Sequence, residues 1–168
     1  IKFGSEYLKK NNIKSHTIDS EIILSKISGI SRESILVNSD IRPCKSQIHS
    51  FNYFISRRAI SKEPIAYLFK EKEFWSNNLI VNTNVLIPRP ETEMIIDIAE
   101  KALTNKKKPK VLDIGTGSGC IGITLASRNK DYDILGIDIS DKALDVANRN
   151  RNKNNLSNIT FIKMDILN

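Results

Sequence analysis

Residues 111–119 have the composition of a ligand-binding turn. They read Val-Leu-Asp-Ile-Gly-Thr-Gly-Ser-Gly, a short apolar strand that leads into three alternating glycines. Gly115, Gly117 and Gly119 allow positive φ angles and bring the backbone close to a ligand. A helix is predicted to begin near Gly119, so its free N–H groups face the same turn. The pattern predicts a nucleoside-binding α/β unit, and a turn without a ligand is disfavoured because three spaced glycines weaken local structure.

Two acidic residues indicate which nucleoside the turn binds. Asp138 ends the next predicted strand, 133–138, and follows Gly115 by 23 residues. Its carboxylate can accept both hydrogen bonds from a ribose diol. Asp113 stands just ahead of the glycines, where a dinucleotide oxidoreductase places a phosphate and has no use for a carboxylate. An S-adenosylmethionine enzyme places a cationic amino acid moiety there, and Asp113 would help to hold it.

The same turn also fits a dinucleotide-binding fingerprint in a shifted register. Residues 117–122, Gly-Ser-Gly-Cys-Ile-Gly, match G-x-G-x-x-G after a predicted strand and at the start of a predicted helix. In that register the fingerprint begins two residues late, because Gly115 already leaves the strand, and Asp113 has no role. An NAD-dependent oxidoreductase is therefore kept as the alternative from another class.

The composition permits one good domain or two small ones. The chain has 168 residues, of which 40% are hydrophobic, and no apolar run approaches the ~20 residues of a membrane helix. Its start has no signal-peptide pattern and no initiator Met. Cys44, Cys120, His16 and His49 show no metal-ligand spacing. We therefore expect free thiols, no metal site and a cytoplasmic location.

The net charge of +7 is concentrated in the first part of the chain. Before Trp75 there are 13 Lys and Arg against 8 Asp and Glu, and after Ser76 there are 13 against 11. A basic face could dock an acidic or RNA-rich partner. Lys, Ile and Asn are abundant even in predicted loops such as 150–155, however, which favours compositional drift. The lysine run at 106–110 is most simply a solvated linker.

The periodicity divides the chain into three parts. Residues 1–72 show helical periods and form a predicted small helical bundle, in which Ile48, Phe51, Ile55 and Ala59 face the core. Residues 73–90 are predicted to form a linker, with a β-hairpin that turns at Asn77-Asn78 and a proline-rich segment.

Residues 91–168 are predicted to be the first part of a Rossmann-like domain. The first predicted helix turns one apolar face inward, with Met94, Ile95, Ile98, Ala102 and Leu103. After it, predicted strands at 111–114, 133–138 and 159–163 alternate with helices that begin near 119 and 141. A doubly wound sheet normally has about five or six strands, so we expect an incomplete domain.

Several motifs, in this order, resemble the release factor glutamine methyltransferases, the HemK-like family. Arg57 to Leu68, with Glu-Pro-Ile-Ala-Tyr-Leu at its end, is similar to the family's Arg-rich helix and Pro-x-x-Tyr segment; Glu73-Phe-Trp is similar to its aromatic segment. The most specific string is Val-Leu-Ile-Pro-Arg-Pro-Glu-Thr-Glu at 85–93, which resembles the family's inter-domain segment. Lys70 and Ser76 stand where the family usually has glycine, and we expect those turns to be reshaped.

The resemblance implies an S-adenosylmethionine-dependent methyltransferase that modifies the glutamine N5 of the Gly-Gly-Gln loop in peptide chain release factors. Gly115, Thr116, Gly117, Ser118 and Gly119 would contact the methionine part of the cofactor, Asp138 the ribose, and Asp165 and Ile166 the adenine. The helical bundle would recognise the release factor, and a full-length monomer would need neither a membrane nor nucleic acid.

The family's acceptor motif, Asn-Pro-Pro-Tyr, does not occur among the 168 residues. The resemblance therefore implies that the catalytic residues lie beyond Asn168 and that this chain alone is inactive. Arg89 and Thr92 either line a cleft between domains or pack the linker. Two alternatives stay open besides the oxidoreductase: a methyltransferase of the same fold that acts on another amide, an amine or RNA, and a non-catalytic helical adaptor.

Overall fold

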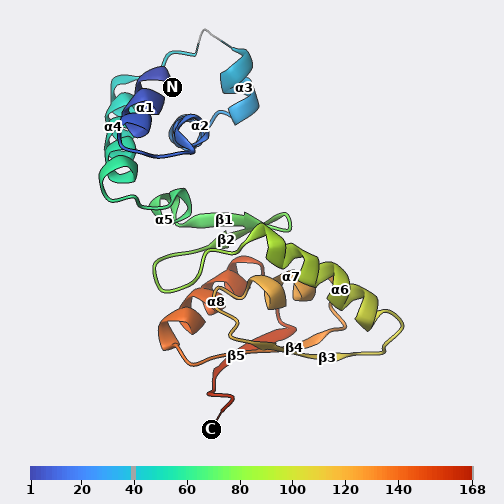
Figure 1. The fold of residues 1–168 in the computed structure, drawn as a ribbon. Helices are drawn as coiled ribbons and strands as arrows, with labels where there is room; N and C mark the ends of the chain where they lie inside the picture. The colour runs from blue at the N-terminus through green and yellow to red at the C-terminus, as the bar shows by residue number, and fades with distance from the viewer. Residues whose placement is uncertain (39–40, 168) are drawn as a thin grey trace. The chain divides into compact units, whose positions relative to one another are not determined.

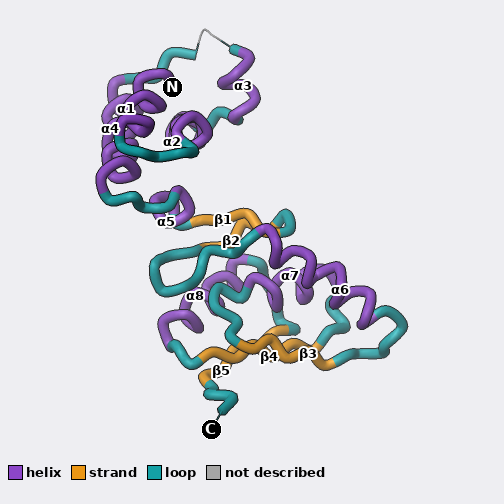
Figure 2. Tube along the Cα trace, in the orientation of Figure 1, coloured by secondary structure: helices purple, strands orange, loops and turns teal. Residues whose placement is uncertain are grey.

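The computed structural model describes residues 1–38 and 41–167, which form two compact units, 1–69 and 70–168. Figure 1 shows the helical first unit and the mixed second unit, and Figure 2 marks their helices and strands. The division lies a few residues before the predicted boundary at 72, because strand β1 already belongs to the second unit.

The described part of the first unit is entirely helical. Its helices are α1 (Lys2–Lys10), α2 (His16–Ser28), α3 (Arg32–Val37), α4 (Lys45–Ile60) and α5 (Ile65–Phe69). Gly4 lets α1 approach α4 closely, because a Cβ atom at this position would lie 2.6 Å from the Phe51 ring. A partly buried ion pair of 2.7 Å between Arg58 Nε and Asp19 Oδ2 joins α4 to α2.

The core of the first unit follows most of the predicted apolar stripe. Phe51, Ile55 and Ala59 of α4 are buried together with Ile23 of α2. The prediction for Ile48 is wrong, since its side chain is 46% exposed near the start of the helix. Periodicity gives the direction of a helical face, but the neighbouring helices decide how much of its length is covered.

The second unit opens with a hairpin that is packed into its core. Strands β1 (Glu71–Phe74) and β2 (Asn77–Ile80) form an antiparallel pair. Phe74 and Leu79 are almost fully buried in the hydrophobic core of the second unit, together with Ile134 and Ile159. The predicted turn at Asn77-Asn78 is wrong: Asn77 pairs with Phe74, so the turn consists of Trp75 and Ser76. The hairpin is thus a structural part of the second unit.

The two positions where glycine was expected keep a glycine-like backbone. Lys70 has φ 57° and Ser76 has φ 63°, both in the left-handed region, and Trp75 beside it has φ 48°. Both residues therefore adopt a conformation that favours glycine and that is strained for a residue with a side chain. A reshaping of these turns relative to the family stays a prediction.

A short 3-10 helix, η1 (Pro90–Thr92), leads into α6 (Glu93–Leu103). The predicted inward face of α6 is wrong for Met94 and Ile98, which are 65% and 63% exposed, for Ile95, which is 46% exposed, and for Ala102, which is also exposed. The helix instead buries Ile96, with Ala99 and Leu103 packed against the same core. Apolar residues occur on several sides of α6, so the pattern alone could not select the buried side.

Three parallel strands form the sheet that carries the glycine turn. The order is β3 (Lys110–Ile114), β4 (Asp133–Asp138), β5 (Ile159–Lys163), with α7 (Cys120–Arg128) and α8 (Asp141–Lys153) as crossover helices. In Figure 1 these helices and α6 lie over the same face of the sheet. Leu112 and Ile114 point away from that face and are 51% and 55% exposed. The observed topology confirms the predicted Rossmann-like α/β class.

Candidate cofactor-binding site

The turn at 115–119 is held against the end of β4 by its own backbone. Gly115 N–H and Thr116 N–H both donate to the carbonyl of Ile137, at 2.9 and 3.0 Å. Gly115, Gly117 and Gly119 have φ angles of 69°, 55° and 80°, which residues with side chains rarely adopt. The turn therefore has a fixed shape that depends on its glycines.

The glycines serve two different purposes. A Cβ atom at Gly115 would meet nothing within 4 Å, and one at Gly117 would meet only the Gly115 carbonyl at 3.9 Å. A Cβ atom at Gly119 would lie 2.8 Å from Ile123 and 2.9 Å from Phe161, inside the core. The first two glycines therefore face open space that a ligand can occupy, whereas the third allows close packing.

This difference bears on the shifted dinucleotide register. Gly122, its last glycine, lies in α7 against the sheet, and a Cβ atom there would come within 2.7 Å of Ile159. Close packing therefore explains why residue 122 is glycine, and close packing together with a positive φ explains Gly119. The residues that leave β3 and face open space are Gly115 and Gly117, so the turn is read in the register that includes Asp113.

Asp138 joins the end of β4 to the turn. Its Oδ2 accepts the Gly117 N–H at 3.0 Å, and its Oδ1 accepts the Ser140 N–H at 3.0 Å. The side chain is half-buried at the carboxyl edge of the sheet. A carboxylate has about four acceptor sites, so both oxygens keep lone pairs for hydroxyl donors. Its predicted role at a ribose is compatible with this geometry.

Asp113 is buried behind the turn. Its Oδ2 accepts hydrogen bonds from Thr116 Oγ1 at 2.7 Å and from the Gly122 N–H at 3.2 Å. Burial raises the pKa of this carboxyl, the hydrogen bonds from Thr116 and Gly122 oppose that shift, and the charge of Asp138 adds to it. Asp113 thus braces the turn against the first turn of α7. Contact with a cofactor stays a prediction for this residue.

Asp165 and Ile166 follow β5 at the same edge of the sheet. The register pairs Asp138 with Lys163, and the next amide, of Met164, donates to the Asp138 carbonyl at 3.1 Å. Asp165 and Ile166 are exposed, and Asp165 Oδ1 accepts the Leu167 N–H at 3.0 Å. Parallel strands bring their carboxyl ends to one edge, which is where α/β sheets bind ligands.

Arg89 and Thr92 lie together around η1. Arg89 is exposed and precedes the 3-10 helix, and its carbonyl accepts the Thr92 N–H at 3.0 Å. This contact shapes the local turn that carries Pro90.

Asn150 contacts the turn but was not predicted as a site residue. It is fully buried in α8 and donates from Nδ2 to the Ser118 carbonyl at 2.9 Å. The available signal was its spacing: it continues the inward stripe of Ala143 and Ala147 with a polar side chain. Ser118 is also noteworthy, because its Oγ is the one buried side-chain polar atom without a hydrogen-bond partner in the described residues.

The two cysteines lie in different units and in different surroundings. Burial raises the pKa of the Cys120 thiol to about 11, so it stays protonated at neutral pH. Cys44 is exposed in the other unit, at the N-terminus of α4. Within residues 1–38 and 41–167, no three His, Cys, Asp or Glu side chains are grouped as metal ligands. In the same part of the chain, no helix combines the length and apolar character that crossing a membrane requires.

The parallel sheet, its glycine turn and the acid at the end of β4 form a Rossmann-like nucleotide-binding unit, which S-adenosylmethionine-dependent methyltransferases share with dinucleotide-binding proteins. Comparison with known families selects the methyltransferases, since residues 105–168 match a methyltransferase domain. Residues 1–69 match the PrmC N-terminal domain.

Curated relatives narrow the family. A release factor glutamine methyltransferase of Buchnera aphidicola subsp. Acyrthosiphon pisum is 40% identical over 159 residues, which are 94% of this chain and 56% of that protein. The corresponding protein of the Schizaphis graminum subspecies is 42% identical over 91% of this chain and 55% of its own length. These matches confirm that the chain resembles the release factor glutamine methyltransferases. It spans about half the length of these relatives.

Among solved structures, a Pyrococcus abyssi tRNA (uracil-54, C5)-methyltransferase in complex with S-adenosyl-L-homocysteine is 21% identical, with a TM-score of 0.47. The similarity covers 56% of this chain and 23% of that protein.

Proposed function

We propose that this chain forms the cofactor-binding part of an enzyme that methylates the N5 atom of the glutamine in the Gly-Gly-Gln loop of peptide chain release factors. The observation that carries the proposal is the turn itself, whose Gly115 and Gly117 face open space beside the half-buried Asp138. The names of the curated relatives support the same substrate.

The residues present fit S-adenosylmethionine. The backbone of 115–119 would hold its methionine part, Asp138 would accept from its ribose hydroxyls, and Asp165 and Ile166 would lie near its adenine. When bound, this group supplies an electrophilic methyl carried by a sulfonium. The chain's own contribution is to hold the turn rigid and to place hydrogen-bond acceptors at one edge of the sheet. A cofactor that is already oriented before the reaction has a lower barrier to group transfer.

The first unit is proposed to recognise the release factor. It matches the PrmC N-terminal domain and carries eleven Lys and Arg against six Asp and Glu in residues 1–69. This positive charge favours association with an acidic partner surface. We propose a cytoplasmic location, a monomeric full-length protein and no requirement for nucleic acid.

A calorimetric titration tests the cofactor assignment. The 168-residue chain is titrated with S-adenosyl-L-homocysteine and, separately, with NAD. Saturable binding of S-adenosyl-L-homocysteine without a response to NAD is expected. The reverse result would support an oxidoreductase, and no response to either ligand would count against a cofactor site in this chain.

A pull-down tests the partner. The chain immobilised through its C-terminus is expected to retain a purified unmethylated release factor at low salt. Retention should weaken at high salt, because salt screens the attraction between the basic first unit and an acidic surface of the release factor. Equal retention of an unrelated acidic protein would argue against specific recognition.

A further inference from the structure

Asn150 connects three backbone groups from two distant segments. It lies on α8 with no exposed surface. Its Nδ2 donates to the carbonyls of Ile80 and Ser118, both at 2.9 Å, and its Oδ1 accepts the Ile80 N–H at 2.6 Å. An Asn amide has two N–H donors and one carbonyl oxygen. All three are used, and the amide pairs with Ile80 in the way that a neighbouring strand would.

The contact with Ser118 fixes a single peptide unit in the glycine turn. The Ser118 carbonyl and the Gly119 N–H belong to the same planar group. The carbonyl accepts from Asn150, and the N–H donates to the Thr116 carbonyl at 2.8 Å. The plane is therefore held at both ends, and it directly precedes the N-terminus of α7.

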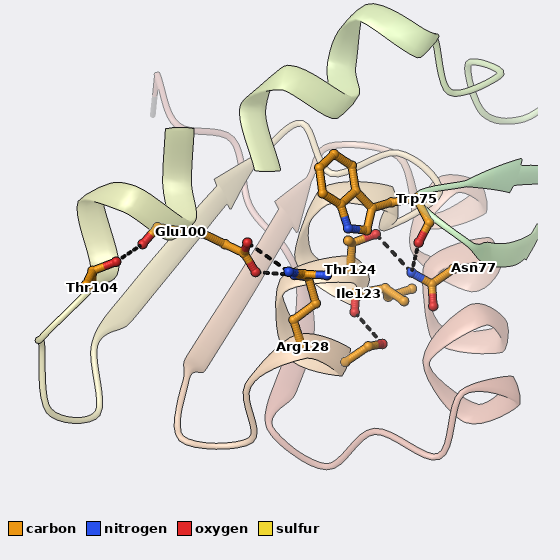
Figure 3. Close-up of polar contacts among 8 residues, drawn as sticks. Trp75, Asn77, Glu100, Thr104, Ile123, Thr124 and Arg128 are labelled. Carbon is orange, nitrogen blue, oxygen red and sulfur yellow. Dashed lines mark hydrogen bonds and ion pairs between the residues drawn. The ribbon is translucent and has the colours of Figure 1, made fainter. Parts of the chain in front are cut away.

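The contact with Ile80 anchors Asn150 to the hairpin. The hairpin is itself fastened to the helices: Asn77 Nδ2 donates to Thr124 Oγ1 at 3.3 Å, and Lys153 Nζ donates to the Asn78 carbonyl at 2.7 Å. Figure 3 shows the first of these contacts beside Trp75, whose ring lies 5.6 Å from the Arg128 guanidinium carbon. Among these contacts, the one made by Asn150 reaches the turn.

We propose that Asn150 is a positioning residue that ties the glycine turn to β2 and thereby sets the affinity for the cofactor. It touches no cofactor itself. The effect on affinity rests on the proposed function, whereas the effect on the rigidity of the turn does not.

Asn158 offers a matched control. It is an Asn of the same unit whose Nδ2 lies within hydrogen-bond distance of three backbone carbonyls, those of Ala126, Asn129 and Tyr132, at 3.1 to 3.2 Å. These acceptors lie at the C-terminal end of α7 and beyond it, whereas the glycine turn precedes the N-terminus of α7. Replacing either Asn by Ala leaves backbone carbonyls without their side-chain donor, and Asn150→Ala also leaves the Ile80 N–H without its acceptor. The two variants are therefore compared at equal global stability.

The first readout needs no ligand. The amide hydrogen exchange rates of Gly117 and Gly119 are compared between Asn150→Ala and Asn158→Ala. Each variant is measured under conditions where its free energy of global unfolding is the same, and the rates are corrected for intrinsic exchange. Exchange in the Asn150 variant is expected to be about tenfold faster, which corresponds to ~1.4 kcal/mol of lost local protection. Equal exchange in the two variants would overturn the proposal.

The second readout is the dissociation constant for S-adenosyl-L-homocysteine. Asn150→Ala should raise it about tenfold (~1.4 kcal/mol), and Asn158→Ala should leave it nearly unchanged. If the unmodified chain does not bind this ligand, the proposed function fails, and the exchange comparison still decides the role of Asn150. If Asn150→Ala does not fold, Asn150→Ser leaves a smaller cavity and is measured instead. Failure of both to fold while Asn158→Ala folds would also overturn the proposal, because it would assign Asn150 to global folding.

Discussion

Ser76→Gly should stabilise the second unit, although it removes a side chain. Ser76 and Trp75 connect β1 to β2 with φ angles of 63° and 48°, the positive pair that a two-residue hairpin turn requires. A side chain in the left-handed region costs roughly 1–2 kcal/mol. Ser76 is exposed, so its replacement by Gly loses no buried surface.

The net gain follows from two opposing effects. Glycine relieves the strain of roughly 1–2 kcal/mol but increases the conformational entropy of the unfolded chain, which costs about 0.4–1 kcal/mol. A net stabilisation of about 1 kcal/mol is expected. In a unit the size of residues 70–168, this raises Tm by roughly 4–8 °C.

Trp75 makes the assay specific for this unit. It is the single tryptophan of the chain, so a thermal melt followed by its fluorescence reports the second unit alone. Ser127→Gly is the matched control, because Ser127 is an exposed serine inside α7. Glycine is a poorer helix former than serine, and the substitution removes the hydrogen bond of 2.8 Å from Ser127 Oγ to the Ile123 carbonyl, so this variant should melt at a lower temperature. A Ser76→Gly protein with an unchanged or lower Tm and a native circular dichroism spectrum would refute the reasoning.

Three further predictions concern the site. Asp138→Ala should weaken binding of S-adenosyl-L-homocysteine by about 1–3 kcal/mol, because the Gly117 and Ser140 amides and the ribose lose their acceptor. Calorimetry should show no such loss for Asp141→Ala, a nearby exposed carboxylate that pairs with Lys163, and equal losses would assign the effect to general charge. Burial raises the pKa of Asp113 above its ordinary value of 3.8, so the folded chain binds this proton more tightly than the unfolded chain. The contribution of Asp113 to stability should therefore decrease as the pH rises from 3.8 through the raised pKa. Urea titrations in this range should show that Asp113→Asn lacks this decrease, and an identical pH dependence in both proteins would contradict it. The 168-residue chain should transfer no label from radiolabelled S-adenosylmethionine to an unmethylated release factor, since it contains no Asn-Pro-Pro-Tyr motif. Label on the Gly-Gly-Gln glutamine would place the acceptor-binding residues within these 168 residues.

The sequence by itself determined the elements and their order. The apolar stripe of α4 and the strand–turn–helix pattern around residues 111–128 depend on local periodicity and on glycine and proline chemistry, which act over a few residues. The sequence placed Asp138 at the end of a predicted strand, and the resemblance implied that Asp165 lies at the adenine. The structure then showed that both residues follow neighbouring parallel strands, whose carboxyl ends meet at one edge of the sheet. Their contacts with a cofactor stay predictions.

Only the tertiary structure decided which faces and contacts are used. It exposed Ile48, Met94 and Ile98, and it showed that Ile123 and Phe161 fill the space where a Gly119 side chain would lie. It also joined Asn150 to Ile80, a residue 70 positions earlier. These outcomes depend on which surface of each helix meets a neighbour that is distant in sequence. Local propensity carries no information about such neighbours, because burial and hydrogen-bond pairing are properties of the assembled layers.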